Sequence, residues 1–153
     1  GARRPAQACA SCRSNSTRYL APTWPAPSRW PELGAEAARL VDLWQPDFEM
    51  LSEDFGDGVE LMVFLCDAVP RLPRLDFAAD AWFLDGFAPD RNPDLWSASM
   101  MRHVFEHTVP GGTFATYSAA GQVRRNLEAA GFTVERRPGF AGKREMLTGR
   151  RPG

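Results

Sequence analysis

Apolar residues recur along the chain with two spacings, and each spacing predicts a different kind of element. Between residues 32 and 44 they return every three or four positions, as on one face of a helix, and Pro46 would stop that helix. Apolar runs at residues 48–53 and 59–65 predict two strands, and the segment Phe55-Gly-Asp-Gly58 between them is a hairpin signal. The predicted apolar face of the helix consists of Leu33, Ala37, Leu40, Val41 and Trp44.

In the second half of the chain, strands and helices alternate. A short apolar run at residues 81–84, bounded by Gly86 and Pro89, predicts a buried central strand. A second strand is predicted over residues 113–117, and the last two strands over 132–137 and 145–148. Helices are predicted over residues 93–107 and 122–130, the latter ended by Gly131. This alternation predicts an α/β fold with a doubly wound sheet and an antiparallel C-terminal hairpin at its edge.

The strand predicted at residues 81–84 leads directly into a carboxylate, Asp85. Open α/β sheets bind their ligands at the carboxyl edge, where such a residue would lie. Gly86 permits a tight turn there, and Pro89 and Pro93 stiffen the loop that follows. An acid, an aromatic residue and a rigid loop at this edge suggest a reaction site. The strand pattern alone equally allows an aspartate that only caps the next helix.

A longer set of segments resembles one family, the methyltransferases that complete the 5-methylaminomethyl group of the wobble uridine in bacterial tRNA. The resemblance covers roughly residues 58 to 148, and the combination is far more specific than any single segment. The segments are DAWFLDGFAP at residues 80–89, NPDLW at 92–96, PGGTFAT at 110–116, VRR at 123–125, AAGFTV at 129–134 and KREML at 143–147.

The resemblance implies a Rossmann-like class I sheet that uses S-adenosyl-L-methionine to methylate the 5-aminomethyl group of tRNA, giving 5-methylaminomethyl-(2-thio)uridine. It also implies the tRNA anticodon stem-loop as a partner and an oxidase domain that uses FAD, fused or separate. The three cysteines make a poor disulfide framework, so we expect the reducing cytoplasm as the location. Two alternatives stay open: a non-catalytic remnant that binds tRNA, and a methyltransferase for small molecules. The first would bind tRNA without the cofactor, and the second would show no dependence on tRNA.

The same resemblance implies roles for individual residues. Asp85 would be the catalytic residue, orienting the amine and accepting its proton, while Asp67 and Ala68 would bind the adenine end of the cofactor. The residues implied to contact the substrate are Phe87, Pro89, Asn92, Lys143 and Arg144.

Plain structural roles are the alternative for several of these residues. Asp67 could cap a turn, and Phe87 could pack in the core. Trp82 and Phe83 are expected in the core, and Trp96 is expected to shape the loop. A wider basic group could grip phosphates of the anticodon stem or simply form a solvated surface. Besides Lys143 and Arg144 it contains Arg124, Arg125, Arg136 and Arg137.

Residues 1–31 differ from the rest of the chain. They hold five arginines and no acidic residue, although the 153-residue chain has a net charge of −1. They are either a disordered leader that resembles a transit peptide or an out-of-frame translation. We favour the second, because reading the codons of residues 10–30 one base earlier permits a strand with an acid, a proline and a helix, as in the family.

On this interpretation, residues 32–150 are the C-terminal part of a methyltransferase domain truncated at its N-terminus. The family's glycine-rich cofactor turn has no counterpart before Asp85. We therefore expect the chain by itself to bind S-adenosylmethionine poorly.

Cysteine and histidine spacing gives little support for a metal. Cys9 and Cys12 form a lone C-x-x-C without a second pair, and His103 and His107 lie four apart without a third ligand. We expect no metal site. A run of about 18 apolar residues, as a membrane span requires, does not occur, so we expect no membrane partner.

Overall fold

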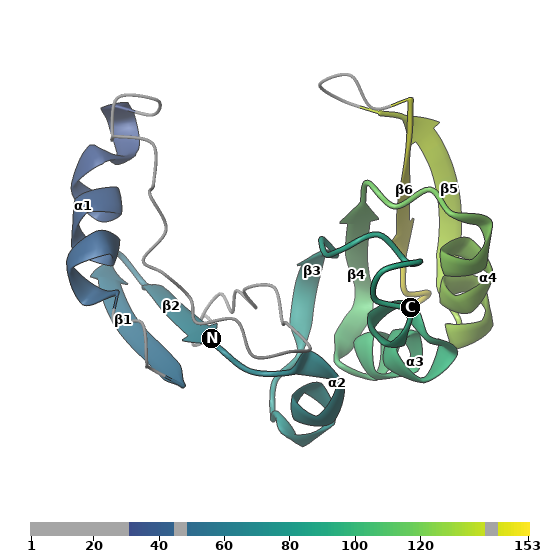
Figure 1. The fold of residues 1–153 in the computed structure, drawn as a ribbon, viewed down its shortest axis with the longest axis horizontal. Helices are drawn as coiled ribbons and strands as arrows, with labels where there is room; N and C mark the ends of the chain where they lie inside the picture. The colour runs from purple at the N-terminus through teal and green to yellow at the C-terminus, as the bar shows by residue number, and fades with distance from the viewer. Residues whose placement is uncertain (1–30, 45–48, 140–143) are drawn as a thin grey trace. The chain divides into compact units, whose positions relative to one another are not determined.

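The computed structural model describes residues 31–44, 49–139 and 144–153. These residues belong to two compact units, Gly1–Cys66 and Asp67–Gly153 (Figure 1). The leader interpretation of residues 1–31, including Cys9 and Cys12, lies almost wholly outside the described residues, and so does Lys143.

The first unit consists of a helix and a hairpin. A 3-10 turn at Pro31–Leu33 leads into α1, Gly34–Leu43, and none of its residues is buried. Strands β1, Met50–Gly56, and β2, Val59–Phe64, pair antiparallel, which confirms the predicted hairpin. Asp57 and Gly58 form its turn, both with positive φ (52° and 77°), as a two-residue hairpin loop requires. Arg39 connects α1 to β1 through an ion pair with Glu53.

The second unit contains a four-stranded mixed sheet in the order β3-β4-β6-β5. Strand β3, Ala79–Phe83, runs parallel to β4, Thr108–Thr116. Strand β6, Glu145–Arg150, is antiparallel both to β4 and to β5, Thr133–Pro138. The predicted α/β class and the antiparallel C-terminal hairpin are therefore confirmed.

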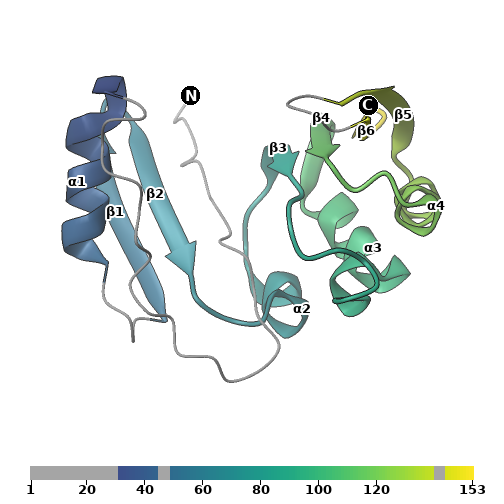
Figure 2. The same ribbon diagram turned by 45° about the horizontal axis from the view of Figure 1, so that its top comes forward.

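Two helices cover one face of this sheet: α3, Ala98–Glu106, and α4, Gly121–Ala130 (Figure 2). Helix α4 ends at Gly131, whose φ of 114° is the predicted C-cap geometry. Phe132 packs edge-on against Phe105 and Phe114, with ring centroids 5.0 Å apart in both pairs. The most deeply buried apolar side chains on this side are Met101, Val104, Phe114, Val123, Leu127 and Leu147. A short helix, α2, Ala68–Arg71, and a 3-10 turn, Leu72–Arg74, precede β3.

The helix predicted over residues 93–107 is divided into two parts. A 3-10 turn, Asp94–Trp96, comes first, and α3 begins only after Ser97. The Ser97 side chain caps α3 by accepting a hydrogen bond from the Met100 backbone N–H at 3.2 Å. A serine at this position therefore ends the 3-10 turn and starts a new helix.

Strand β3 was predicted to be buried and central, and this is wrong for the described structure. It lies at the edge of its sheet, where it pairs only with β4. Phe83 was expected in the core but is 87% exposed, because it points to the face that no helix of this unit covers. Trp82 points the other way and is half-buried, and its Nε1–H donates to Thr108 Oγ1 at 2.8 Å.

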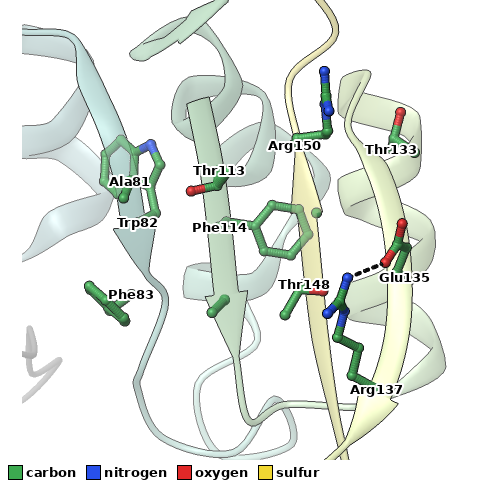
Figure 3. A pocket seen from close by; sticks show the side chains of 12 residues that line it. Ala81, Trp82, Phe83, Thr113, Phe114, Thr133, Glu135, Arg137, Thr148 and Arg150 are labelled. Carbon is green, nitrogen blue, oxygen red and sulfur yellow. Dashed lines mark hydrogen bonds and ion pairs between the residues drawn. The ribbon is translucent and has the colours of Figure 1, made fainter. Parts of the chain in front are cut away.

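The uncovered face of the sheet forms an open depression of about 370 Å³ (Figure 3). Residues of all four strands line it; three of them, Trp82, Phe83 and Phe114, are aromatic, and most of the others are small or polar. The Arg137 guanidinium and the Glu135 carboxylate form an ion pair on β5 at 2.9 Å. We call this surface the open face; its side chains are Ala81, Phe83, Thr113, Ala115, Thr133, Glu135, Arg137, Thr148 and Arg150.

No described helix is long and apolar enough to cross a membrane.

Candidate active site

Asp85 stands just beyond the carboxyl end of β3, where the sequence placed it. The Leu84 N–H donates to the Ala115 carbonyl at 2.9 Å and extends the parallel pairing by one residue before the chain turns away. Asp85 is exposed, and among the described residues its Oδ1 accepts from the Gly86 N–H alone, at 2.9 Å. Ser97 caps α3, so the alternative that Asp85 caps the next helix is wrong. Its other oxygen, Oδ2, has no hydrogen-bond donor among the residues that the structure describes.

The loop after Asp85 is fixed by its own backbone. The Ala88 carbonyl accepts from the N–H groups of Arg91 (2.8 Å) and Asn92 (3.1 Å), which closes a turn around Pro89. Phe87 is 46% exposed, so packing in the core is not its role in this unit. The loop therefore presents an aromatic ring two residues from the carboxylate.

Trp96 holds this loop from beneath, which confirms the structural role expected of it. It is 5% exposed, and its Nε1–H donates to the Phe87 carbonyl at 2.8 Å. Gly86 lies against the neighbouring Leu95, since a Cβ at Gly86 would come within 2.8 Å of Leu95 Cδ2. A larger residue at position 86 would displace the Leu95 side chain, so the turn after Asp85 is in contact with the 3-10 turn that precedes α3.

Asp67 has a structural role of its own. It precedes α2, and its Oδ1 caps that helix by accepting from the Val69 N–H at 2.9 Å. Asp67 is exposed, whereas Ala68 is 7% exposed. Asp67 and Asp85 lie on either side of β3 in the chain, and no hydrogen bond or ion pair among the described residues joins them.

Much of the predicted basic group is neutralised within the unit. Arg124 pairs with Glu128 at 2.8 Å, Arg136 with Glu145 at 3.3 Å, and Arg137 with Glu135. Arg125 bonds to Gln122 instead, at 2.8 Å. Arg144 is exposed and pairs with no acid among the described residues. The charge open to an anionic partner is therefore smaller than the sequence suggested.

His107 takes part in packing. Its ring nitrogens lie 2.8 Å from the His103 carbonyl and 3.0 Å from the Leu75 carbonyl, and its ring packs on Phe77. Among the residues that the structure describes, no group of three or more His, Cys, Asp or Glu side chains could hold a metal ion.

Asn126 was not singled out from the sequence. It is 9% exposed, and its Nδ2 donates to the Trp96 carbonyl at 2.7 Å. Its position on the apolar stripe of α4, between Val123 and Leu127, is the sequence feature that could have indicated a buried polar residue.

Residues 31–152 match the sequence model of a family described as S-adenosyl-L-methionine-dependent methyltransferase. The chain belongs to this family. The match includes all of the described secondary structure and the loop from Asp85 to Trp96.

Proteins of one name from several bacteria are similar in sequence to this chain. The tRNA 5-methylaminomethyl-2-thiouridine biosynthesis bifunctional protein MnmC of Aromatoleum aromaticum is 48% identical over 126 residues, covering 80% of this chain and 20% of the relative. The protein of that name from Ectopseudomonas mendocina is 46% identical over 123 residues, covering 78% and 19%. The methyltransferase chain thus spans about a fifth of the length of the curated relatives it matches.

A solved structure supports the fold. MNMC2 from Aquifex aeolicus superposes with a TM-score of 0.68 at 25% sequence identity, covering 96% of this chain and 45% of that chain.

The described residues fit the family's cofactor at one point. The Asp67 carboxylate is exposed and has one oxygen left after capping α2, and a carboxylate oxygen suits the amino group of an adenine. S-adenosylmethionine, when bound, supplies the methyl group that this family transfers.

Proposed function

We propose that this methyltransferase acts in 5-methylaminomethyl-2-thiouridine biosynthesis in tRNA, where it converts the 5-aminomethyl group of the wobble uridine to 5-methylaminomethyl. The observation that supports this most is the identity of 39–48% to relatives of that name over about four-fifths of the chain. The exposed carboxylate and aromatic ring after β3 are the groups that such a reaction needs at its substrate. An oxidase domain that uses FAD would be a fused or separate partner.

In the proposed reaction, Asp85 acts on the amine. The amine must be neutral to attack, and it carries an extra proton once its nitrogen–carbon bond has formed and the carbon–sulfur bond of the donor has broken. The Asp85 carboxylate accepts a hydrogen bond from the amine, which orients its lone pair, and then takes that proton. Among the described residues it bonds only to the Gly86 N–H, which leaves acceptor capacity for both tasks.

The other proposed contacts surround that carboxylate. Phe87 would stack on the uracil ring, since enzymes that modify bases extrude the base and hold it against aromatic surfaces. Pro89 and Asn92 shape the turn that presents this ring. Arg144, with Lys143, would contact phosphates of the anticodon stem-loop. Asp67 and Ala68 would hold the adenine end of the cofactor.

Methyl transfer to defined tRNA tests the proposal. The protein as encoded is incubated with S-adenosylmethionine labelled in its methyl group and tRNA that carries 5-aminomethyl-2-thiouridine. The matched control is the same tRNA with an unmodified wobble uridine. We expect label only in the first tRNA. Label in neither would contradict the proposal, and label in a small molecule without tRNA would favour a different substrate.

The 153-residue chain alone is expected to bind S-adenosylmethionine weakly, because the family's glycine-rich cofactor turn has no counterpart before Asp85, which leaves Asp67 and Ala68 as the cofactor contacts that we assign. Calorimetric titration of this chain measures the affinity directly. Micromolar affinity would contradict the expectation. Specific binding of tRNA without the cofactor would instead favour a non-catalytic role in tRNA binding.

A further inference from the structure

The loop that carries Asp85 and Phe87 is linked to helix α4, which lies later in the sequence, through the buried residue Trp96. Trp96 bonds to the loop through its side chain, since its indole N–H reaches the Phe87 carbonyl at 2.8 Å. It bonds to α4 through its backbone, since its carbonyl accepts from Asn126 Nδ2 at 2.7 Å. These two bonds join residues 87, 96 and 126 in a single chain of contacts.

Asn126 is itself held in one orientation. The Gln122 side chain, one turn earlier on α4, donates from Nε2 to Asn126 Oδ1 at 2.8 Å. The oxygen is thereby occupied, and the NH₂ group is directed at Trp96. Because Asn126 is 9% exposed and Trp96 is 5% exposed, water has little access to replace either bond.

The hydrogen bond between Asn126 and Trp96 lies next to backbone that contacts the Asp85 loop at two places. Trp96 ends the 3-10 turn, and the next residue, Ser97, is the N-cap of α3. Leu95 lies against Gly86, the residue that follows Asp85. A shift of residues 95–96 would therefore change both the contact of Leu95 with Gly86 and the hydrogen bond of Trp96 to the Phe87 carbonyl.

We propose that Asn126 is a positioning residue, which holds Asp85 and Phe87 in their working geometry through Trp96. Its side chain is buried and bonds to Gln122 and Trp96, so it would act through Trp96 and not on the substrate itself. The proposal rests on the proposed function, in which Asp85 and Phe87 act on the target uridine. Small displacements of a reacting group reduce turnover steeply, so loosening this contact should lower kcat more than it changes cofactor binding.

Asn126→Leu tests the proposal in the protein as encoded, because leucine has similar volume but cannot hydrogen-bond. The matched control is Glu128→Gln, an exposed change on the same helix that removes only the surface ion pair with Arg124. Hydrogen exchange is measured peptide by peptide, together with kcat and KM. For Asn126→Leu we expect exchange on the order of tenfold faster in residues 85–97, with β5 and β6 unchanged. We expect kcat to fall by about tenfold, with KM for S-adenosylmethionine within about twofold of the wild type.

Trp96→Phe is the second variant, in case Asn126→Leu does not fold. It keeps an aromatic ring beneath the loop but removes the N–H that reaches Phe87, and it should give the same pattern of exchange. Unchanged exchange in residues 85–97 in a folded variant would overturn the proposal, as would a kcat equal to that of Glu128→Gln in an active protein. If the wild-type protein methylates no tRNA, the proposed function fails, and the exchange data still decide whether Asn126 positions the loop.

Discussion

The two faces of the four-stranded sheet differ sharply, although the same strands build both. On the face under α3 and α4, Phe114 and Leu147 are 2% and 0% exposed. On the open face, Thr113 precedes Phe114 and Thr148 follows Leu147, and neither is buried (Figure 3). Alternate residues of a strand point to opposite faces, so one position separates a core residue from a surface residue. The difference indicates that the helix-covered face supplies most of the packing stability of this unit.

Phe83 is the one large apolar side chain among the residues of the open face. It is a large apolar residue on the open face, at the end of edge strand β3, and it leads into the Asp85 loop. The other apolar side chains of that face are small, Ala81 and Ala115. We expect the loss in the free energy of unfolding to follow the burial of the substituted position, so a substitution under the helices should cost more than one on the open face.

Leu147→Ala should have the largest effect. Leu147 is fully buried, so the truncation loses apolar burial and leaves a cavity, at a cost of about 2–5 kcal/mol in the free energy of unfolding. Thr148→Ala, one residue along on the open face, is the control and should cost about 1 kcal/mol or less. Urea denaturation of both variants measures the two values. Equal losses would contradict the difference between the faces.

Gly149→Ala should come next, with a loss of about 1–3 kcal/mol through overpacking. A Cβ at Gly149 would overlap the Thr133 carbonyl oxygen and the Phe114 ring. Relieving the overlap would require both the β5 backbone and the buried Phe114 ring to move, which costs stability. Thermal unfolding followed by circular dichroism would show the change as a lower Tm. A Tm equal to that of the wild type would mean that the helix-covered face packs more loosely than described.

Phe83→Thr should have the smallest effect, within about 0.5 kcal/mol, because an exposed substitution that removes no partner rarely matters more. Threonine also suits an edge strand. The same denaturation experiment on the 153-residue chain gives the value. A loss above about 2 kcal/mol would show that Phe83 is covered in solution, and the open face would then be an interface.

Local patterns in the sequence predicted much of this fold. The Asp57-Gly58 turn and the Gly131 cap depend on backbone conformations that few other residues adopt, so they could be recognised from residue type alone. The antiparallel C-terminal pair was predicted from the two closing strands, whereas the strand order is known only from the structure. The position of β3 at an edge could not be predicted, because an apolar run has the same pattern whether or not a neighbouring strand covers it.

The candidate site was predicted less completely. The position of Asp85 after a strand is a property of the chain order and was correct. The ion pairs that neutralise Arg124, Arg136 and Arg137 depend on side-chain placement, which residue spacing did not specify. The contact between Asn126 and Trp96 joins residues 30 positions apart, so no local pattern announced it.

The central claim, that the loop after β3 contains the reaction centre, is tested most directly by Asp85→Asn. Its matched control is Asp90→Asn, the same chemical change at an exposed position of the same loop. In the methyl-transfer assay with tRNA bearing 5-aminomethyl-2-thiouridine, Asp85→Asn should lower kcat by on the order of 100-fold or more, because an amide cannot accept the amine's proton. Asp90→Asn should match the wild type. Turnover by Asp85→Asn equal to that of Asp90→Asn would remove Asp85 from the mechanism.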